Sequence, residues 1–132
     1  MAALDTTVLV RLLVEDDPAQ LAAVRRLIRR TVTAGQTLFI PVTVVVDLEW
    51  VLRASFRFAK SDILRTMSQL LSSVELAFES EGAIEVALMQ YQDGAADFSD
   101  CLHAGLAAAA GESPLLTFDR AAAKVAGVQL LA

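Results

Sequence analysis

Asp97-Phe98-Ser99-Asp100-Cys101-Leu102-His103 is the stretch around which the chain is organised. It opens the most apolar helix of the sequence, which ends at Gly111. Asp97 and Asp100 are three residues apart, so a helix projects both from one face near its first turn. Asp97 stands where an N-cap belongs. Asp100 falls inside the helix, where an unpaired carboxylate is costly. We therefore interpret the pair as part of a site for a divalent metal.

The bulk composition predicts one domain over residues 1–132. Hydrophobic residues make up 55% of the chain, yet no apolar run is long enough to span a bilayer. This excess is typical of a parallel sheet that is covered on both faces. Asp5 interrupts the apolar start of the chain, so no signal peptide is expected. The single cysteine, Cys101, excludes an internal disulfide and indicates a reducing cytoplasm.

The charge distribution is uneven. The net charge of −5 argues against nucleic-acid binding by the chain as a whole. Residues 1–65, however, carry nine Lys or Arg against seven acids, whereas residues 66–132 carry two against nine. A local basic patch is therefore compatible with the acidic total. Four arginines at positions 25, 26, 29 and 30 share the outer face of one predicted helix. Such a face is most often simply solvated, and contact with RNA is the alternative.

Strands alternate with helices along the whole chain, which predicts an α/β three-layer sandwich with a mainly parallel five-stranded sheet. The hydrophobic periodicity places strands at 1–4, 37–41, 74–77, 114–118 and 128–131. It places helices at 8–13, 19–33, 44–56, 61–71, 81–91, 97–110 and 121–126. Asp17 is the expected N-cap of the second helix, with Pro18 in its first position, and Thr43 is the expected N-cap of the third.

Acidic residues recur where the predicted strands end. Asp5 follows the first strand, Asp119 follows the fourth, and Asp97 and Asp100 open the helix that leads into the fourth. Asp47 lies one turn into the helix after the second strand and can reach the same edge. The carboxyl ends of parallel strands share one edge of a sheet, where ligands gather. Converging carboxylates repel one another, and Mg²⁺ or Mn²⁺ relieves that repulsion. Such a site suits metal-activated water that attacks a phosphodiester.

Three of these acids also have a purely structural interpretation. Asp5, Asp97 and Asp119 each precede a predicted helix and are candidate N-caps. Asp47 and Glu49 compete for one place, because they lie about 200° apart on a helix. Glu49 has Arg53 at the i+4 position, the favourable order for an exposed ion pair, so we assign Glu49 to the surface and Asp47 to the site.

Other kinds of catalytic site find little support. His103 lies one turn beyond Asp100, and a lone histidine on an alanine-rich helix is more often structural than catalytic. Cys101 has no partner in a nucleophile arrangement and is interpreted as a small core residue. Glycine-rich phosphate loops and Ser-His-Asp signatures are absent.

Four motifs in this order resemble those of PIN-domain proteins, and most closely the VapC toxins of bacterial type II toxin–antitoxin systems. The motifs are Leu4-Asp5-Thr6-Thr7-Val8-Leu9-Val10-Arg11, Asp47-Leu48-Glu49-Trp50-Val51-Leu52-Arg53, residues 97–103 as quoted above, and Thr117-Phe118-Asp119. The resemblance runs the whole length of the chain. It implies a Mg²⁺- or Mn²⁺-dependent endoribonuclease, usually dimeric, that is inhibited by a cognate VapB-type antitoxin.

The resemblance also implies roles for single residues. Asp5, Asp100 and Asp119 match the acidic quartet of the family, with Asp5 and Asp100 as the metal ligands, and Asp97 matches an additional acid. Asp47 stands where the family normally has Glu, and it would orient or activate water.

Two departures from the family pattern keep alternatives open. Thr7 stands where the family usually has Asn, and Asp47 is one methylene shorter than Glu, so Glu49 remains a substitute for Asp47. One rival interpretation is a catalytically weakened PIN-fold module that acts through association with its antitoxin. Another is a phosphatase-like or response-regulator-like domain, which would need a lysine near its last strand; residues 128–132 contain none.

Overall fold

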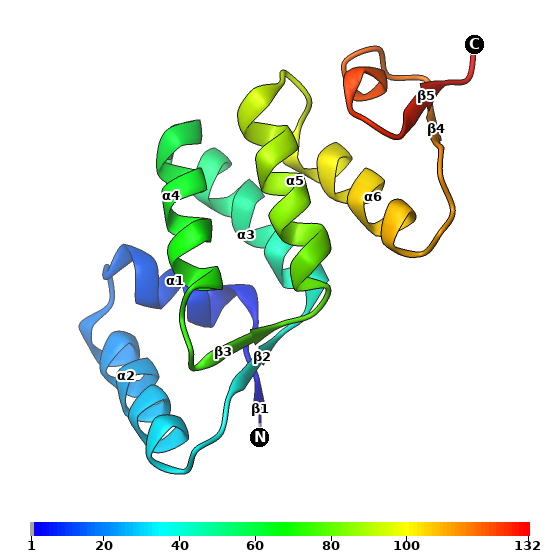
Figure 1. Ribbon diagram of the computed structural model, residues 1–132. Coiled ribbons are helices and arrows are strands. Elements are labelled where there is room, and N and C mark those ends of the chain that lie inside the picture. Colours follow the sequence, from blue (N-terminus) through cyan, green and yellow to red (C-terminus); the bar gives the residue numbers. More distant parts are fainter. Residues whose placement is uncertain (1) are drawn as a thin grey trace. The chain divides into compact units, whose positions relative to one another are not determined.

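All the strand pairs that the structure describes are parallel, as the alternation of strands and helices predicts. The computed structural model describes residues 2–132; Met1, predicted as the start of the first strand, lies outside them. The strands are β1 (Ala2–Ala3), β2 (Leu38–Ile40), β3 (Leu76–Phe78), β4 (Leu115–Thr117) and β5 (Val128–Leu130). The α-helices are α1 (Thr6–Val14), α2 (Pro18–Thr33), α3 (Val42–Ala54), α4 (Lys60–Leu71), α5 (Glu81–Asp93) and α6 (Phe98–Ala109), with a short 3₁₀ helix, η1, at Ala122–Lys124 (Figure 1).

The α/β class with parallel strands is confirmed. The strands form two hydrogen-bonded sheets, one of three strands in the order β1-β2-β3 and one made of β4 and β5. The chain divides at the same place into two compact units, Met1–Glu79 and Ser80–Ala132. Each unit is therefore described by itself. A single PIN-like domain over residues 1–132 stays a prediction. Within residues 2–132 no helix combines the length and the apolar character needed to cross a membrane.

The first unit buries its apolar side chains between the three-stranded sheet and its helices. β2 is the central strand, and Leu38 and Ile40 are almost fully buried there, at 1% and 0% exposure. Helix α1 contacts both α2 and α3, and α3 contacts α4. Leu9 from α1 and Leu52 from α3 are likewise inaccessible to solvent. This packing places the start of α1, directly after β1, beside α3.

The N-termini of α2 and α3 are satisfied in two different ways. Asp17 accepts a hydrogen bond from the Gln20 backbone N–H at 3.1 Å, with Pro18 in the first position of α2, as predicted. The predicted cap Thr43 is wrong, because α3 already begins at Val42. The Val42 N–H instead donates to Oε1 of Glu79 at 2.8 Å. A side chain from the end of β3 thus supplies the acceptor that the local sequence lacks.

The second unit is built on close contact between α5 and α6. The hydrogen that Gly105 carries in place of a side chain allows this approach, since a Cβ there would lie 3.0 Å from the Ala83 carbonyl oxygen. The rings of Tyr91 and Phe98 meet edge to face, with centroids 5.7 Å apart. Cys101 is buried at 1% exposure, which confirms its place in the core.

The end of α6 and the segment between β4 and β5 complete this unit. Gly111 has a φ of +74°, and the Glu112 N–H bonds back to the Ala107 carbonyl at 2.9 Å, so the helix stops at the glycine as predicted. The helix predicted at 121–126 is shorter than expected: only residues 122–124 are helical, as one 3₁₀ turn. The helix ends there because Val125 already has an extended backbone conformation, three residues before β5 begins.

Candidate functional site

Asp5 stands where β1 gives way to α1. Its Oδ1 accepts the Val8 backbone N–H at 3.1 Å, so the capping role considered as the structural alternative is confirmed. The side chain is nevertheless exposed, and the cap uses Oδ1, which leaves the lone pairs of Oδ2 for another partner. Capping also fixes the orientation of the carboxylate at the end of the strand. The structural and the metal-binding interpretations of Asp5 are therefore compatible.

Asp47 faces the start of α1 from helix α3. Its side chain is exposed, and its Oδ2 accepts a hydrogen bond from the Thr6 hydroxyl at 3.4 Å. Thr6 therefore belongs to this site, although sequence reasoning singled out only the neighbouring Thr7. The signal was present, since Thr6 follows Asp5 directly and is thereby carried to the same sheet edge. The first unit thus brings Asp47 next to the residue that follows Asp5.

Two pockets flank α1 at this edge, each about 360 Å³. One contains Asp47 and the other contains Asp5, and both are lined by Thr7 and Arg11. Arg11 is held from two sides: its Nε donates to Gln20 Oε1 at 2.5 Å, and its Nη1 lies 3.2 Å from Asp16 Oδ1. Thr7 and Arg11, one turn apart, form a ridge between the pockets.

Glu49 is not on the surface, contrary to the sequence-based assignment. Its side chain is only 4% exposed, with Arg53 Nε at 2.8 Å from its Oε2. The predicted i,i+4 ion pair exists, but its acid lies inside the protein. Glu49 follows Val45 by four residues and Leu48 by one, and both are in the core. A broad buried arc of α3 therefore includes position 49.

Three acids of the second unit influence one another. Partial burial raises the pKa of the Asp100 carboxyl, the negative charges of Asp119 and Asp97 raise it further, and His103 opposes them. Asp97 occupies the N-cap position of α6, but its side chain makes no capping hydrogen bond, so that part of the prediction is wrong. The exposed Asp97 carboxylate thus adds its charge to Asp100 and does not satisfy the helix end.

Asp119 organises the turn after β4. Its Oδ1 accepts the N–H groups of Ala121 and Ala122 at 2.8 and 3.0 Å, and its own N–H donates to the Thr117 hydroxyl at 3.0 Å. The capping role considered for Asp119 is confirmed. As at Asp5, the contacts engage Oδ1, and Oδ2 is left for other contacts.

The predicted acids therefore fall into two groups, Asp5 with Asp47 in the first unit and Asp97, Asp100 and Asp119 in the second. In the part of the chain that the structure describes, no three His, Cys, Asp or Glu side chains are close enough to hold a metal ion together. The donor chemistry still fits Mg²⁺ or Mn²⁺, because all five are carboxylates and three of them form a repulsive group that a cation would relieve.

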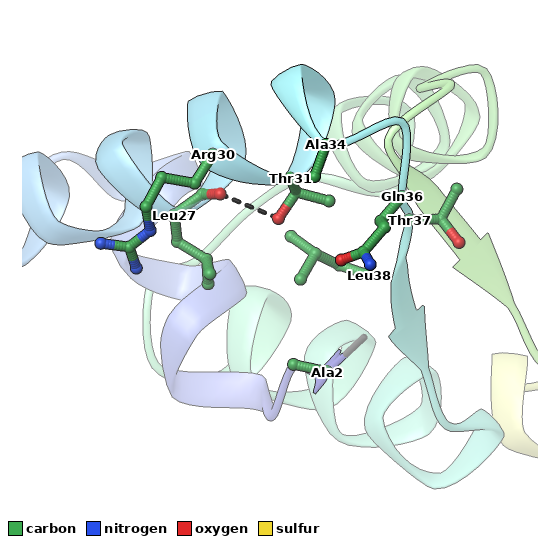
Figure 2. Close-up of a pocket in the computed structure, with 8 residues that line it drawn as sticks. All are labelled: Ala2, Leu27, Arg30, Thr31, Ala34, Gln36, Thr37 and Leu38. Atoms are coloured by element: carbon green, nitrogen blue, oxygen red, sulfur yellow. Dashed lines mark hydrogen bonds between the residues drawn. The ribbon is translucent and has the colours of Figure 1, made fainter.

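A further pocket, of about 320 Å³, lies at the other end of the strands (Figure 2). It is lined by Ala2, Leu27, Arg30, Thr31, Ala34, Gln36, Thr37 and Leu38. The Thr31 hydroxyl donates to the Leu27 carbonyl at 2.8 Å, so the buried polar atom is satisfied within the helix. None of the predicted acids lines this pocket, and it is separate from the acidic edge.

The model of the PIN domain family matches residues 2–128, and the chain belongs to this family. Among curated proteins it is similar to a VapC ribonuclease of Aquifex aeolicus (strain VF5). The two are 25% identical over 120 residues, which cover 91% of this chain and 88% of the relative. The resemblance to PIN-domain proteins of the VapC type is therefore confirmed.

Proposed function

We propose that the protein is a metal-dependent endoribonuclease, the toxin of a VapBC-like type II toxin–antitoxin system, that hydrolyses RNA phosphodiester bonds. The observation that carries the proposal is the similarity to a VapC ribonuclease over nine-tenths of the chain, with carboxylates at the ends of β1 and β4 and at the start of α6. Those positions are where parallel α/β sheets gather their ligands.

Asp5 and Asp100 would hold Mg²⁺ or Mn²⁺. Such an ion, when bound, lowers the pKa of a water ligand and neutralises negative charge on the phosphodiester. Asp97 and Asp119 complete the acidic surroundings of Asp100, as their effect on its pKa supports. Asp47 would orient the attacking water. We keep Asp47 in this role, since the competing carboxylate of Glu49 is buried against Arg53.

The proposal extends to partners and compartment. A toxin of this kind would be restrained by a cognate VapB-type antitoxin and act as a homodimer on RNA in the cytoplasm. The lone cysteine of the sequence is buried, which suits a reducing compartment. A pull-down of tagged toxin co-expressed with the neighbouring small open reading frame tests antitoxin binding. Sedimentation of the purified protein tests the homodimer.

The metal ligands are tested by replacing Asp5 or Asp100 with Asn. Asparagine caps a helix as well as aspartate does, so Asp5→Asn keeps the bond from Val8 and the fold. We expect RNA cleavage in Mg²⁺ to fall about 100-fold or more, because a ligand charge contributes several kcal/mol to such catalysis. Asp93 is an exposed acid at the end of α5, so Asp93→Asn is the matched control, and this variant should cleave RNA at the wild-type rate. Wild-type cleavage by both ligand variants would refute the assignment.

A second candidate function is a catalytically weakened PIN module that acts through antitoxin binding. Thr7 in place of the usual Asn, and the short side chain of Asp47, are the features that favour it. Expression without antitoxin separates the two, since the ribonuclease should arrest growth and the weakened module should not. Asp47→Glu adds the missing methylene and should raise cleavage if reach limits the reaction.

A further inference from the structure

Helix α2 carries a concentration of positive charge that the proposed catalysis does not use. Residues 18–46 contain no Asp or Glu, and the arginines of α2 are Arg25, Arg26, Arg29 and Arg30. Arg25 lies 3.4 Å from Glu15. Within residues 2–132, the structure gives the side chains of the other three no ion pair and no hydrogen bond. These three exposed arginines, 26, 29 and 30, are called the α2 basic face.

Repulsion between these arginines destabilises helix α2. Arg26 and Arg30 are four residues apart, and Arg26 and Arg29 are three apart, so like charges lie side by side on the surface. Such pairs destabilise a helix, and an acid one turn away would have removed the cost. A groove of about 320 Å³ runs beside this surface, lined in part by Arg26 and Arg29. The charge is thus left available to an anion from outside the unit.

The α2 basic face adjoins the pocket that contains Asp5. Gln20, Ala23 and Val24 form the α2 wall of that pocket. Ala23 precedes Arg26 by three residues and Arg30 by seven, and both spacings keep side chains on one side of a helix. Arg30 also lines the pocket of Figure 2, where its side chain extends away from Gln36. A chain bound beside Asp5 would therefore pass over Ala23 directly onto Arg26 and Arg30.

We propose that the α2 basic face binds the phosphate backbone of the single-stranded RNA whose scissile bond lies at Asp5. This inference rests on the proposed function, and it adds where the substrate is held. Guanidinium groups match phosphate oxygens in a two-pronged geometry. Helix α2 contains no aromatic residue on which a base could stack, so the contact recognises charge and not sequence. Continuity with the Asp5 pocket favours RNA over an acidic protein, because the proposed function already places the scissile phosphodiester at Asp5 and its flanking phosphates must run onto the adjoining surface.

The test measures RNA binding without cleavage. A fluorescein-labelled single-stranded RNA of about 12 nucleotides and mixed sequence is titrated with the protein in EDTA, and anisotropy is followed at several salt concentrations. The variant is Arg26→Gln/Arg30→Gln, because Gln keeps the helix propensity of Arg. The control is Arg25→Gln/Arg65→Gln, which removes the same charge from arginines already paired with Glu15 and Asp62.

Two lost phosphate contacts should lower the slope of log affinity against log salt by about 1.4, and weaken binding roughly 10- to 30-fold near 0.1 M salt. The control should keep the wild-type slope, and the melting temperature of the test variant should not fall. Unchanged affinity and slope in Arg26→Gln/Arg30→Gln would overturn the proposal. So would a loss confined to polyglutamate, used as a parallel probe, which would mark the surface as one for acidic protein.

Cleavage of the same RNA in Mg²⁺ separates this inference from the proposed function. A wild-type protein that binds through Arg26 and Arg30 but does not cleave refutes the ribonuclease and leaves the binding surface standing. If the wild-type protein cleaves RNA and the Arg26→Gln/Arg30→Gln variant binds and cleaves it equally well, only the binding surface is refuted. A wild-type protein that neither binds nor cleaves refutes both.

Discussion

The close contact between α5 and α6 predicts that a glycine-to-alanine substitution changes the stability of the protein in opposite directions at Gly105 and Gly82. Gly105 lies in α6, and a Cβ built there would be 3.0 Å from the Ala83 carbonyl oxygen, whereas comfortable C···O contacts begin near about 3.3 Å. The neighbour is backbone, so the helices must separate by a few tenths of an ångström. Overpacking of this kind costs about 1–3 kcal/mol, offset by about 1 kcal/mol of helix propensity. We expect Gly105→Ala to destabilise the protein by about 1 kcal/mol.

Gly82 in α5 provides the matched control. A Cβ there meets nothing within 4 Å, so Gly82→Ala should stabilise the protein by about 0.5 kcal/mol through propensity alone. Urea unfolding of the metal-free proteins measures both, as shifts of the midpoint in opposite directions. A Gly105→Ala variant as stable as Gly82→Ala would refute the argument that Gly105 is there for close packing. Because α6 also carries Asp100, Gly105→Ala should in addition weaken the Mg²⁺-dependent gain in melting temperature.

Three further outcomes are expected. Glu79→Ala removes the acceptor of the Val42 N–H and should cost about 0.5–2 kcal/mol in urea unfolding, with Glu79→Gln costing less because an amide oxygen still accepts. Asp17→Ala removes the acceptor of the Gln20 N–H and should lower the free energy of unfolding by about 1 kcal/mol. An unchanged unfolding midpoint would contradict the capping role of Asp17. The raised pKa of Asp100 favours the folded state below the usual pKa of 3.8, and that contribution is lost as pH rises through the folded-state value. In EDTA, Asp100→Asn should therefore melt higher than wild type at pH 7, with the difference shrinking towards pH 3.5; a constant difference would exclude the linkage.

Most helices and strands are predictable from the sequence, because residues that start and stop helices stand where the hydrophobic pattern also begins and ends. The capping aspartate and proline at the start of α2, and the glycine stop after α6, are local devices, and both are found where predicted. The start of α3 was not predictable in this way. Its first free N–H is satisfied by Glu79, 37 residues away, and only the folded first unit brings the two together.

The candidate site was predictable in its residue types and less so in their environments. The i,i+4 spacing of Glu49 and Arg53 predicts an exposed pair, but Glu49 is buried, because its spacing from Val45 and Leu52 puts it within the core arc of α3. The sequence predicts that the Asp97 side chain caps α6, but an N-cap position fixes the backbone and not the side chain, which makes no capping hydrogen bond. The position of Thr6 directly after Asp5 places it at the sheet edge, but its hydrogen bond to Asp47 joins residues 41 apart in two helices and is not predictable from local sequence.

Because Cys101 is buried, alkylation of its thiol can be used to measure local opening of α6. The chain has no other cysteine, this one is 1% exposed, and it follows Asp100 directly. A shielded thiol is alkylated only when the segment around it opens, so the labelling rate at a fixed reagent concentration reads out the free energy of that opening. Mass spectrometry of this single modification would thus report how often α6 opens around Cys101, without a residue being introduced and without catalytic turnover.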